Sequence, residues 1–511
     1  NSATAVGRFA KATANQTIAI GFNANADANQ GIAIGDQALA NDTYTIAIGS
    51  NSDASGDRSI AIGFNAKATG INAAAVMVGS QACGVNSLAF GQFSYACGVN
   101  SLAMGVDARA TATDSYAIGV NANATHTNGF AFGTYANAQG VNAFAVGPNA
   151  FASGTNSFAM GPNAYAKGND SFAMGPGAVA NGDGSFALGD FATDASGAND
   201  SLVTGDGANV SASNASAFGT ESTIWSGATY SYAYGYDSLV YIGAENAIAS
   251  GTQANALANN SMAMGMQAQT GGANSIAIGF NARTYGTSDH QQSVNSIAVG
   301  ISSRANGANS MAYGSMANAN GANAIAFGAN ASSNGPNTSA SGTNARAIGF
   351  NAIADGTDAL AEGRNVIAIG VGAKAIGYNT NVTAMGTDGY AEGTNAMAMG
   401  TNSYAVGINV TAIGPCARAC GLDTTAFGTK AIAYGDQALA VGAFSSAYGD
   451  YTSAFGPGAT SRAFGSTAIG MNAVTTRPFE VSLGSAASPY SLPGLHPNGF
   501  IGDRYQKPGE K

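Results

Sequence analysis

The chain repeats a pattern of small, apolar and polar positions with a period of seven residues. The string SIAIGFNAKATG at 59–70 recurs as SLAFGQFSYACG at 87–98 and as SFAMGPNAYAKG at 157–168. Glycines recur at every fourteenth position over 105–189, and a second series over 140–182 lies halfway between them. A fixed short period indicates one small structural unit that is stacked many times. We therefore predict coils of fourteen residues, each built from two similar halves.

Each half predicts a short β-strand followed by a glycine turn. Side chains alternate between the two faces of a strand, so Ala61 points to one side while Ile60 and Ile62 point to the other. In the following half, Ala66 and Ala68 again share one side. Because small residues recur in both halves, we expect them to face each other inside a narrow coil. Glycine closes each turn at little conformational cost. The pattern therefore predicts an all-β parallel solenoid with two strands in each coil.

The outward side chains of the first strand are large and apolar. Recurring at every fourteenth position, they form a column of phenylalanines and, beside it, a column of aliphatic residues. A continuous apolar stripe of this length exceeds what soluble monomers leave exposed. We therefore predict a homo-oligomer with closed rotational symmetry, whose interface contains both columns. The predicted interface residues are Phe130, Phe144, Phe158, Phe172, Phe186, Met160, Met174 and Leu188.

The outward side chains of the second strand are mostly polar, but some are aromatic. Phe151 and Tyr165 are one repeat apart, and Tyr95 occupies the same position in an earlier coil. Stacked aromatic side chains on this face suit either a bound carbohydrate or partner protein, or simple cross-strand packing. Trp225 lies beside the irregular aromatic stretch 230–243, which is either a contact surface or a region of local repacking. These four aromatic residues are candidates for a ligand face.

The repeat is interrupted at several places. Some glycines within 189–251 are sixteen positions apart instead of fourteen, so we expect irregular, bulged coils there. A still longer step, from Gly279 to Gly300, predicts an inserted loop near 287–293, which contains His290. The loop is either a tolerated surface insertion or a recognition loop, since binding residues favour loops on rigid scaffolds. His290 is therefore a further candidate for ligand contact.

Composition excludes several classes of protein. Only 9% of the 511 residues are charged and 72 are glycine, so large side chains are too few for a thick globular core. The net charge is −10 and the basic residues are scattered, which argues against a nucleic-acid partner. Apolar runs are short and broken by glycine, so we predict no transmembrane helix.

The residues that commonly carry chemistry form no recognisable site. Cys83 and Cys97 occupy equivalent positions one coil apart, where a disulfide is possible but not required. Cys416 and Cys420 lie too far apart along one extended half to bond each other. The histidines lack metal-ligand spacing, and no pair of acidic residues suggests a glycosidase. We predict no catalytic, cofactor or metal site and no enzymatic activity.

The repeated units carry a resemblance to a known family. NSIAIG, NSLAFG and NSFAMG, paired with NAxAxG halves, resemble the head repeats of YadA-like trimeric autotransporter adhesins over about 17–470. The resemblance implies a left-handed parallel β-roll and a trimer whose axis is lined by the apolar face. It also implies an extracellular or cell-surface adhesin. Such an adhesin attaches a bacterium to a matrix protein such as collagen, to a glycan, to a cell-surface receptor or to other cells.

The C-terminal part suggests an alternative. We place the solenoid in 1–470 and a proline- and glycine-rich tail or cap in 471–511, where the family would continue into a neck and stalk. Neither the heptads of a stalk nor the strand pattern of an outer-membrane barrel follows the repeats. The alternative is therefore a structural subunit of a phage or viral fibre, or of an extracellular filament, that assembles through its ends.

Overall fold

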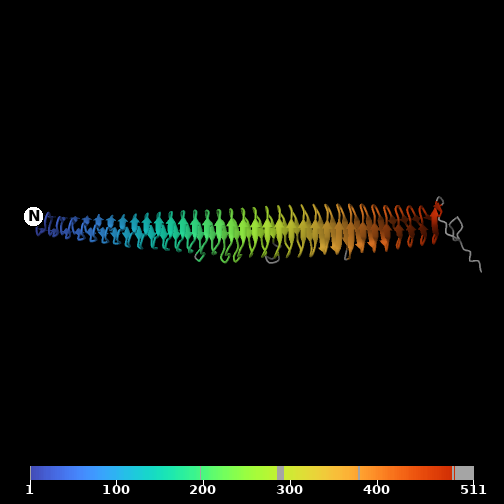
Figure 1. Cartoon of the computed structure of the whole chain (residues 1–511), viewed down its shortest axis with the longest axis horizontal. Coiled ribbons are helices and arrows are strands. Elements are labelled where there is room, and N and C mark those ends of the chain that lie inside the picture. The colour runs from blue at the N-terminus through green and yellow to red at the C-terminus, as the bar shows by residue number, and fades with distance from the viewer. Residues whose placement is uncertain (1, 196, 285–292, 378–379, 486–487, 490–511) are drawn as a thin grey trace, which may run out of the picture. The chain divides into compact units, whose positions relative to one another are not determined.

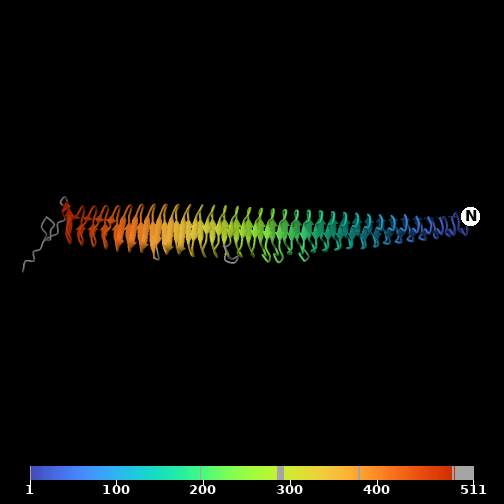
Figure 2. The ribbon, with the colours of Figure 1, turned by 180° about the vertical axis from the view of Figure 1, so that it is seen from behind.

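The computed structural model describes residues 2–195, 197–284, 293–377, 380–485 and 488–489. Within these ranges the chain is all-β and contains no helix. It divides into two compact units, Asn1–Asn260 and Ser261–Lys511. In each unit the chain winds as a parallel β-solenoid in which every coil adds one strand to each of two sheets (Figures 1 and 2). The predicted fold class is confirmed.

The strands are short and regular in the first unit. Its odd-numbered strands, from β1 (Thr4–Val6) to β35 (Ile248–Ser250), have three residues each. Its even-numbered strands, from β2 (Lys11–Ala12) to β36 (Asn255–Ala256), have two residues each. This alternation follows directly from the two halves of the repeat.

The second unit has the same arrangement with more varied strand lengths. Its odd-numbered strands run from β37 (Met262–Met264) to β67 (Val481–Ser485), and its even-numbered strands from β38 (Gln269–Thr270) to β66 (Val474–Thr475). β68 (Ser488–Pro489) pairs antiparallel with β67. Several even-numbered strands extend to five residues: β48 (Arg346–Phe350), β50 (Leu360–Arg364), β54 (Tyr390–Thr394), β56 (Tyr404–Ile408) and β58 (Arg418–Leu422).

Within each unit, apart from β68, neighbouring strands of a sheet pair in parallel and are one coil apart. Ile60 of β9 (Ile60–Ile62) pairs with Ala74, and Lys67 of β10 (Lys67–Ala68) pairs with Gln81, so the step is fourteen residues in both sheets. Side chains at equivalent repeat positions therefore lie directly above one another. This register turns every sequence position of the repeat into a column along the solenoid.

The core consists of alanine columns. Ala61 of the odd sheet and Ala66 and Ala68 of the even side are fully buried, whereas Ile60 and Ile62 are not. The largest fully buried side chains are Ile224 and several valines, so no aromatic ring lies inside the described coils. The predicted narrow core of small residues is therefore present.

The turn from an odd-numbered to an even-numbered strand, which we call the G-x-N corner, depends on glycine. Gly63 has φ 136° and the following Asn65 has φ 56°. A Cβ atom on Gly63 would lie 2.5 Å from the carbonyl oxygen of Met77 in the next coil. Glycine is needed here both for its positive φ and because the next coil approaches so closely.

Met77 occupies this glycine position with φ 104°, which is strained for a residue with a side chain. We expect Met77→Gly to raise the melting temperature, because it relieves about 1–3 kcal/mol of strain against about 1 kcal/mol of added chain entropy. Calorimetry of the full chain measures the change. The control is Val78→Gly at the next residue, which should lower the melting temperature. A decrease for both variants would contradict the strain argument.

Asparagine side chains form ladders at the opposite corner. Asn72 Nδ2 donates to Asn86 Oδ1 over 2.9 Å, Asn86 donates to Asn100 over 2.9 Å, and Asn100 donates to Asp114 over 2.9 Å. Each amide both donates and accepts, so a ladder can continue through any number of coils. A carboxylate only accepts, which is why Asp114 ends the run.

In the coils that the structure describes, all departures from the regular step fall at this second corner. It is the turn from an even-numbered to an odd-numbered strand, which we call the insertion corner. The paired residues at these departures are Phe186 and Leu202, Ser216 and Tyr232, Tyr232 and Ile248, Ile367 and Thr383, and Ile276 and Ile297. The first four pairs are separated by two residues more than the regular step, and the last pair by seven more. In each case the extra residues follow the even-numbered strand. In the first unit the resulting loops project from one edge (Figure 1).

Most of the loop predicted at 287–293 lies outside the described residues, and so does His290. Its last residue, Ser293, is buried, and its hydroxyl donates to the carbonyl oxygen of Thr284. The stretch before and after the loop therefore keeps the solenoid register.

Candidate interaction surfaces

The apolar face is formed by the outward side chains of the odd-numbered strands. The rings of Phe130, Phe144, Phe158 and Phe172 stack with centroids 4.6–4.7 Å apart and planes within 8° of parallel. Phe186 continues the column at 5.9 Å and 30°, and it is 44% exposed. Stacking covers the ring faces and leaves the ring edges outward. The predicted phenylalanine column is therefore a continuous, rigid strip.

A second column runs beside the phenylalanines. Met160 of β23 (Phe158–Met160) pairs with Met174, and Met174 pairs with Leu188. Met174 is more than one-third exposed. The structure brings all eight predicted interface residues together on one face of five consecutive coils.

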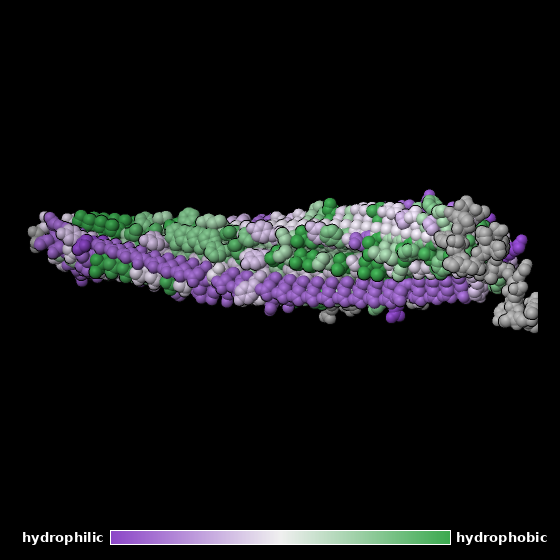
Figure 3. Space-filling view, turned by 45° about the vertical axis from the view of Figure 1, so that its right-hand side comes forward, coloured by the Kyte–Doolittle hydropathy of each residue, from purple (hydrophilic) through white to green (hydrophobic). Residues whose placement is uncertain are grey.

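Apolar side chains remain exposed on odd-numbered strands in both units. Ile62 and Met104 in the first unit, and Met264, Tyr313 and Phe327 in the second, are all more than one-third exposed. Figure 3 shows patches of apolar surface in both units, alongside a continuous hydrophilic band. Exposed apolar surface on this scale marks a surface that other molecules cover.

The candidate ligand residues of the second face do not form one site. Phe151 and Tyr165 are neighbours with ring centroids 6.0 Å apart, and Lys167 Nζ lies 5.5 Å from the Tyr165 ring centre. Tyr95 of β14 (Tyr95–Ala96) pairs with Arg109, and further coils separate it from Phe151. The structure therefore joins two of these residues and leaves Tyr95 apart.

Trp225 lies on a different element from these aromatic residues. It directly follows β32 (Thr223–Ile224), at the start of a turn of the insertion corner. This turn has two residues more than a regular one. The Trp225 side chain is 45% exposed. Tyr230, Tyr241 and Ile242 are also about half exposed on the same loop or on the loop of the next coil. The structure thus places Trp225 at the insertion corner, as it does the exposed Tyr230 and Tyr241, and away from the column of Tyr165.

Asp194 is a buried carboxylate that the sequence analysis missed. It takes the position of a core alanine, between Ala180 and Val210, and is fully buried. Its Oδ2 accepts from Gly182 N over 2.6 Å, and its Oδ1 accepts from Ser201 Oγ over 2.6 Å. Burial raises the pKa of Asp194, although these hydrogen bonds oppose the shift. An aspartate within an alanine column was the signal available in the sequence.

The buried Asp194 predicts a pH effect. Because its pKa is raised on folding, the folded state binds this proton more tightly than the unfolded state. The contribution of Asp194 to the free energy of unfolding is therefore most favourable below about pH 4. It is lost as the pH rises through the raised pKa. Relative to Asp194→Asn, the melting temperature of the wild type should fall between about pH 3 and pH 7. Calorimetry over this range is the measurement, and parallel curves for both proteins would contradict it.

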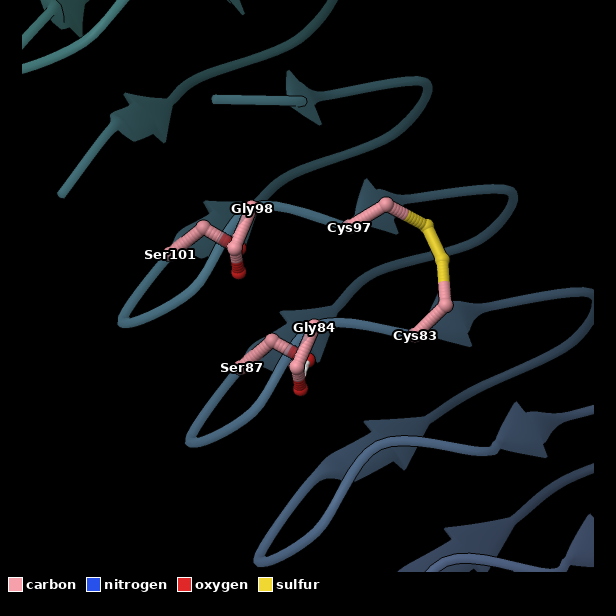
Figure 4. Close-up of a disulfide and its surroundings, with 6 residues drawn as sticks. All are labelled: Cys83, Gly84, Ser87, Cys97, Gly98 and Ser101. Carbon is pink, nitrogen blue, oxygen red and sulfur yellow. Dashed lines mark hydrogen bonds between the residues drawn. A yellow bond between two sulfur atoms is a disulfide. The ribbon is translucent and has the colours of Figure 1, made fainter. Parts of the chain in front are cut away.

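Cys83 and Cys97 form a disulfide between adjacent coils (Figure 4), which settles the pairing that the sequence left open. Their Cα atoms are 4.4 Å apart. Next to them, Ser87 Oγ donates to Gly84 O and Ser101 Oγ donates to Gly98 O, each over 2.7 Å. Cys416 and Cys420 are free, as their spacing predicts. The disulfide links coils that the sheets already hold in register.

The described residues contain no group of three or more His, Cys, Asp or Glu side chains that could hold a metal ion. Among the same residues, no helix has the length and hydrophobicity that a membrane span requires. One open depression of about 340 Å³ lies on the second unit. It is lined by Ser302, Arg304, Met316, Ala317, Asn318, Asn330 and Ser332.

A stack of short parallel coils with an apolar outward face defines a β-solenoid repeat protein. The family model described as the YadA head domain repeat matches well over half of the chain, and the chain therefore belongs to this family. The matched residues are 1–24, 26–52, 54–76, 82–108, 96–115, 110–136, 138–164, 166–192, 243–268, 260–282, 271–288, 292–317, 310–331, 319–345, 340–365, 347–373, 391–415, 421–445 and 447–473. The stretch 193–242, which holds Trp225, is not among them.

A solved structure is also similar. The chain is 18% identical to the collagen-binding domain of the Yersinia adhesin YadA, with a TM-score of 0.13. The similarity covers 43% of this chain and 69% of that domain. No curated protein matches the chain.

Proposed function

We propose that this chain is the non-catalytic head of a cell-surface adhesin that assembles as a homotrimer through its apolar face. The observation that carries the proposal is the continuous apolar face of the odd-numbered strands, with its phenylalanine rings stacked 4.6–4.7 Å apart. Burying each such side chain stabilises an assembly by roughly 1.5–3 kcal/mol. Membership of the YadA head family supports three copies and attachment to host, matrix or other cell surfaces.

The position of the inserted residues supports the same proposal. All five departures from the regular step fall at the insertion corner, and none falls at the G-x-N corner of the described coils. Loops need free space, so this corner is the one we expect to face solvent in the trimer. The polar face and the insertion corner then remain free to contact a matrix protein, a glycan or a cell-surface receptor.

Light scattering coupled to size exclusion tests the assembly. We expect a mass of three times 50.2 kDa, or about 150 kDa, that does not change on dilution. A stable monomer would refute the role of the apolar face. Long particles of growing mass would favour the filament alternative, in which the chain assembles through its ends.

Binding of the trimer to immobilised collagen, other matrix proteins and host cells tests the attachment function. We expect saturable binding to at least one of these surfaces. A trimer that binds none of them would retain the assembly but contradict the proposed attachment.

A further inference from the structure

The net negative charge of this chain is concentrated in one stretch of the first unit. Residues 168–260 contain nine acidic residues and no lysine or arginine, which leaves nineteen acidic and eighteen basic residues elsewhere. Nearly the whole net charge of −10 therefore comes from this stretch. Apart from the buried Asp194, all of its acidic residues are exposed: Asp170, Asp183, Asp190, Asp200, Asp206, Glu221, Asp237 and Glu245.

The same stretch displays exposed aromatic rings at the insertion corner. Trp225 is 45% exposed and Tyr241 is 49% exposed, and each opens the inserted loop of its coil. Ala228 N donates to Trp225 O over 3.3 Å, and Ala244 N donates to Tyr241 O over 3.1 Å. The two loops thus contain the same hydrogen-bonded turn.

The loops also stack on each other. Trp225 N donates to Val240 O over 3.1 Å, and Gly243 N donates to Ser226 O over 3.0 Å. The two rings are therefore presented by consecutive, mutually bonded coils, which reduces the entropy lost when a partner binds. Exposed Trp and Tyr side chains on a rigid support are typical of the centres of binding interfaces.

Four exposed carboxylates share the insertion corner with these rings. Asp170, Asp183 and Asp200 lie at this corner in three successive coils that come before the aromatic loops. Glu245 lies in the loop of Tyr241. Hydrogen bonds hold the neighbouring coils together: Gly184 N donates to Asn169 O over 2.8 Å, and Asn169 N donates to the Asp183 carboxylate oxygen Oδ1 over 2.7 Å. At about 4.8 Å per coil, the six coils from Asp170 to Glu245 extend over roughly 24 Å.

We propose that this acidic-aromatic edge, consisting of Asp170, Asp183, Asp200, Trp225, Tyr241 and Glu245, binds an extended basic polypeptide segment. Lysine and arginine side chains of the partner pair with the carboxylates, and at least one cation packs on the face of Trp225 or Tyr241. An extended segment of about seven residues spans the edge at roughly 3.3 Å per residue. The charge excludes anionic glycans and nucleic acids as partners of this edge. The inference rests on the proposed attachment function and names the partner chemistry of one surface.

Trp225 is the only tryptophan of the chain, so its fluorescence reports directly on this edge. Titration of the full chain with a nona-arginine peptide should change the fluorescence saturably at low ionic strength and less at high salt. A nona-glutamate peptide should cause no change. Absence of any response to nona-arginine would overturn the proposal, as would a response to neutral oligosaccharides alone.

Matched variants locate the binding surface. Surface plasmon resonance should show about tenfold weaker binding of nona-arginine to Trp225→Ala. A larger loss of affinity for nona-arginine is expected for a charge variant of the edge. In this variant Asp170, Asp183 and Asp200 become Asn and Glu245 becomes Gln. The control changes Asp190, Asp206 and Asp237 to Asn and Glu221 to Gln, which removes equal charge from the G-x-N corner of the same stretch.

The control variant should bind nona-arginine nearly as well as the wild type. Equal losses for both charge variants would mean that net charge attracts the peptide without a defined site, and would overturn the proposal. Mass and matrix binding of the same proteins are measured in parallel. A trimer that binds a matrix surface but not nona-arginine refutes this inference alone, whereas a monomer or a trimer without surface binding refutes the proposed function.

Discussion

Ala159→Leu is expected to destabilise the coils around it by about 3 kcal/mol or more, at the upper end of what overpacking costs. Ala159 is fully buried in β23, and the even-numbered strand of the same coil contributes the buried Ala166. Two backbones separated by alanine side chains cannot move apart locally without breaking the register to the coils on both sides. Hydrogen exchange of the β23 amides and the melting temperature measure the effect.

Ala159→Ser is the matched control, because serine occupies buried positions elsewhere, such as Ser333 and Ser461. It adds little volume, and its hydroxyl can bond the backbone. We expect a change of less than about 1 kcal/mol. If leucine were tolerated as well as serine, the core would be wider than a layer of alanines, and the argument for the narrow coil would fail.

A triple variant that replaces three stacked rings at the centre of the apolar face is expected to dissociate the assembly. It combines Phe144→Glu, Phe158→Glu and Phe172→Glu. Each substitution removes roughly 1.5–3 kcal/mol of apolar burial per chain. It also brings carboxylates into a surface that has no basic partner nearby, since the paired residues on both sides are phenylalanines. We expect dissociation of the trimer at concentrations where the wild type stays associated, measured by light scattering on dilution.

The control for this variant introduces the same ladder of charges on the other face. Arg109→Glu, Asn123→Glu and Asn137→Glu lie on consecutive even-numbered strands, as the phenylalanines lie on consecutive odd-numbered strands. Repulsion within each chain is therefore similar in both variants. The control should remain a trimer. Equal loss of mass in both would show that repulsion within the chain, and not the interface, causes dissociation.

The sequence predicted the apolar face residue by residue, because parallel register at one fixed step converts sequence periodicity into columns. The eight predicted interface residues accordingly lie together, although their role in assembly stays a prediction. The ligand face could not be predicted in the same way. Tyr95, Phe151 and Tyr165 share a repeat position, but the coils between Tyr95 and Phe151 separate them. Trp225 follows an interruption of the repeat, where counting residues no longer assigns a column.

The buried Asp194 shows a second limit of sequence reasoning. Its partners Gly182 and Ser201 lie in neighbouring coils, and only the geometry of the inserted turn brings their polar atoms within 2.6 Å. The longer step between Ile367 and Thr383 was missed as well, although the sixteen positions from Gly370 to Gly386 were its signal in the sequence. Both features arise where one turn differs from the others.

By itself the sequence determined the coil length, the two strands per coil, the alanine core and the two unlike faces. These depend on local geometry: alternation along a strand, the φ angles that glycine and asparagine adopt, and the size of the side chains between two backbones. Only the tertiary structure decided which cysteines bond, that the inserted residues follow even-numbered strands, and that Trp225, Tyr241 and four of the exposed carboxylates of residues 168–260 share the insertion corner. The disulfide depends on how closely two side chains at equivalent positions approach, and the other two features depend on coils whose spacing is irregular, so the period alone does not specify them.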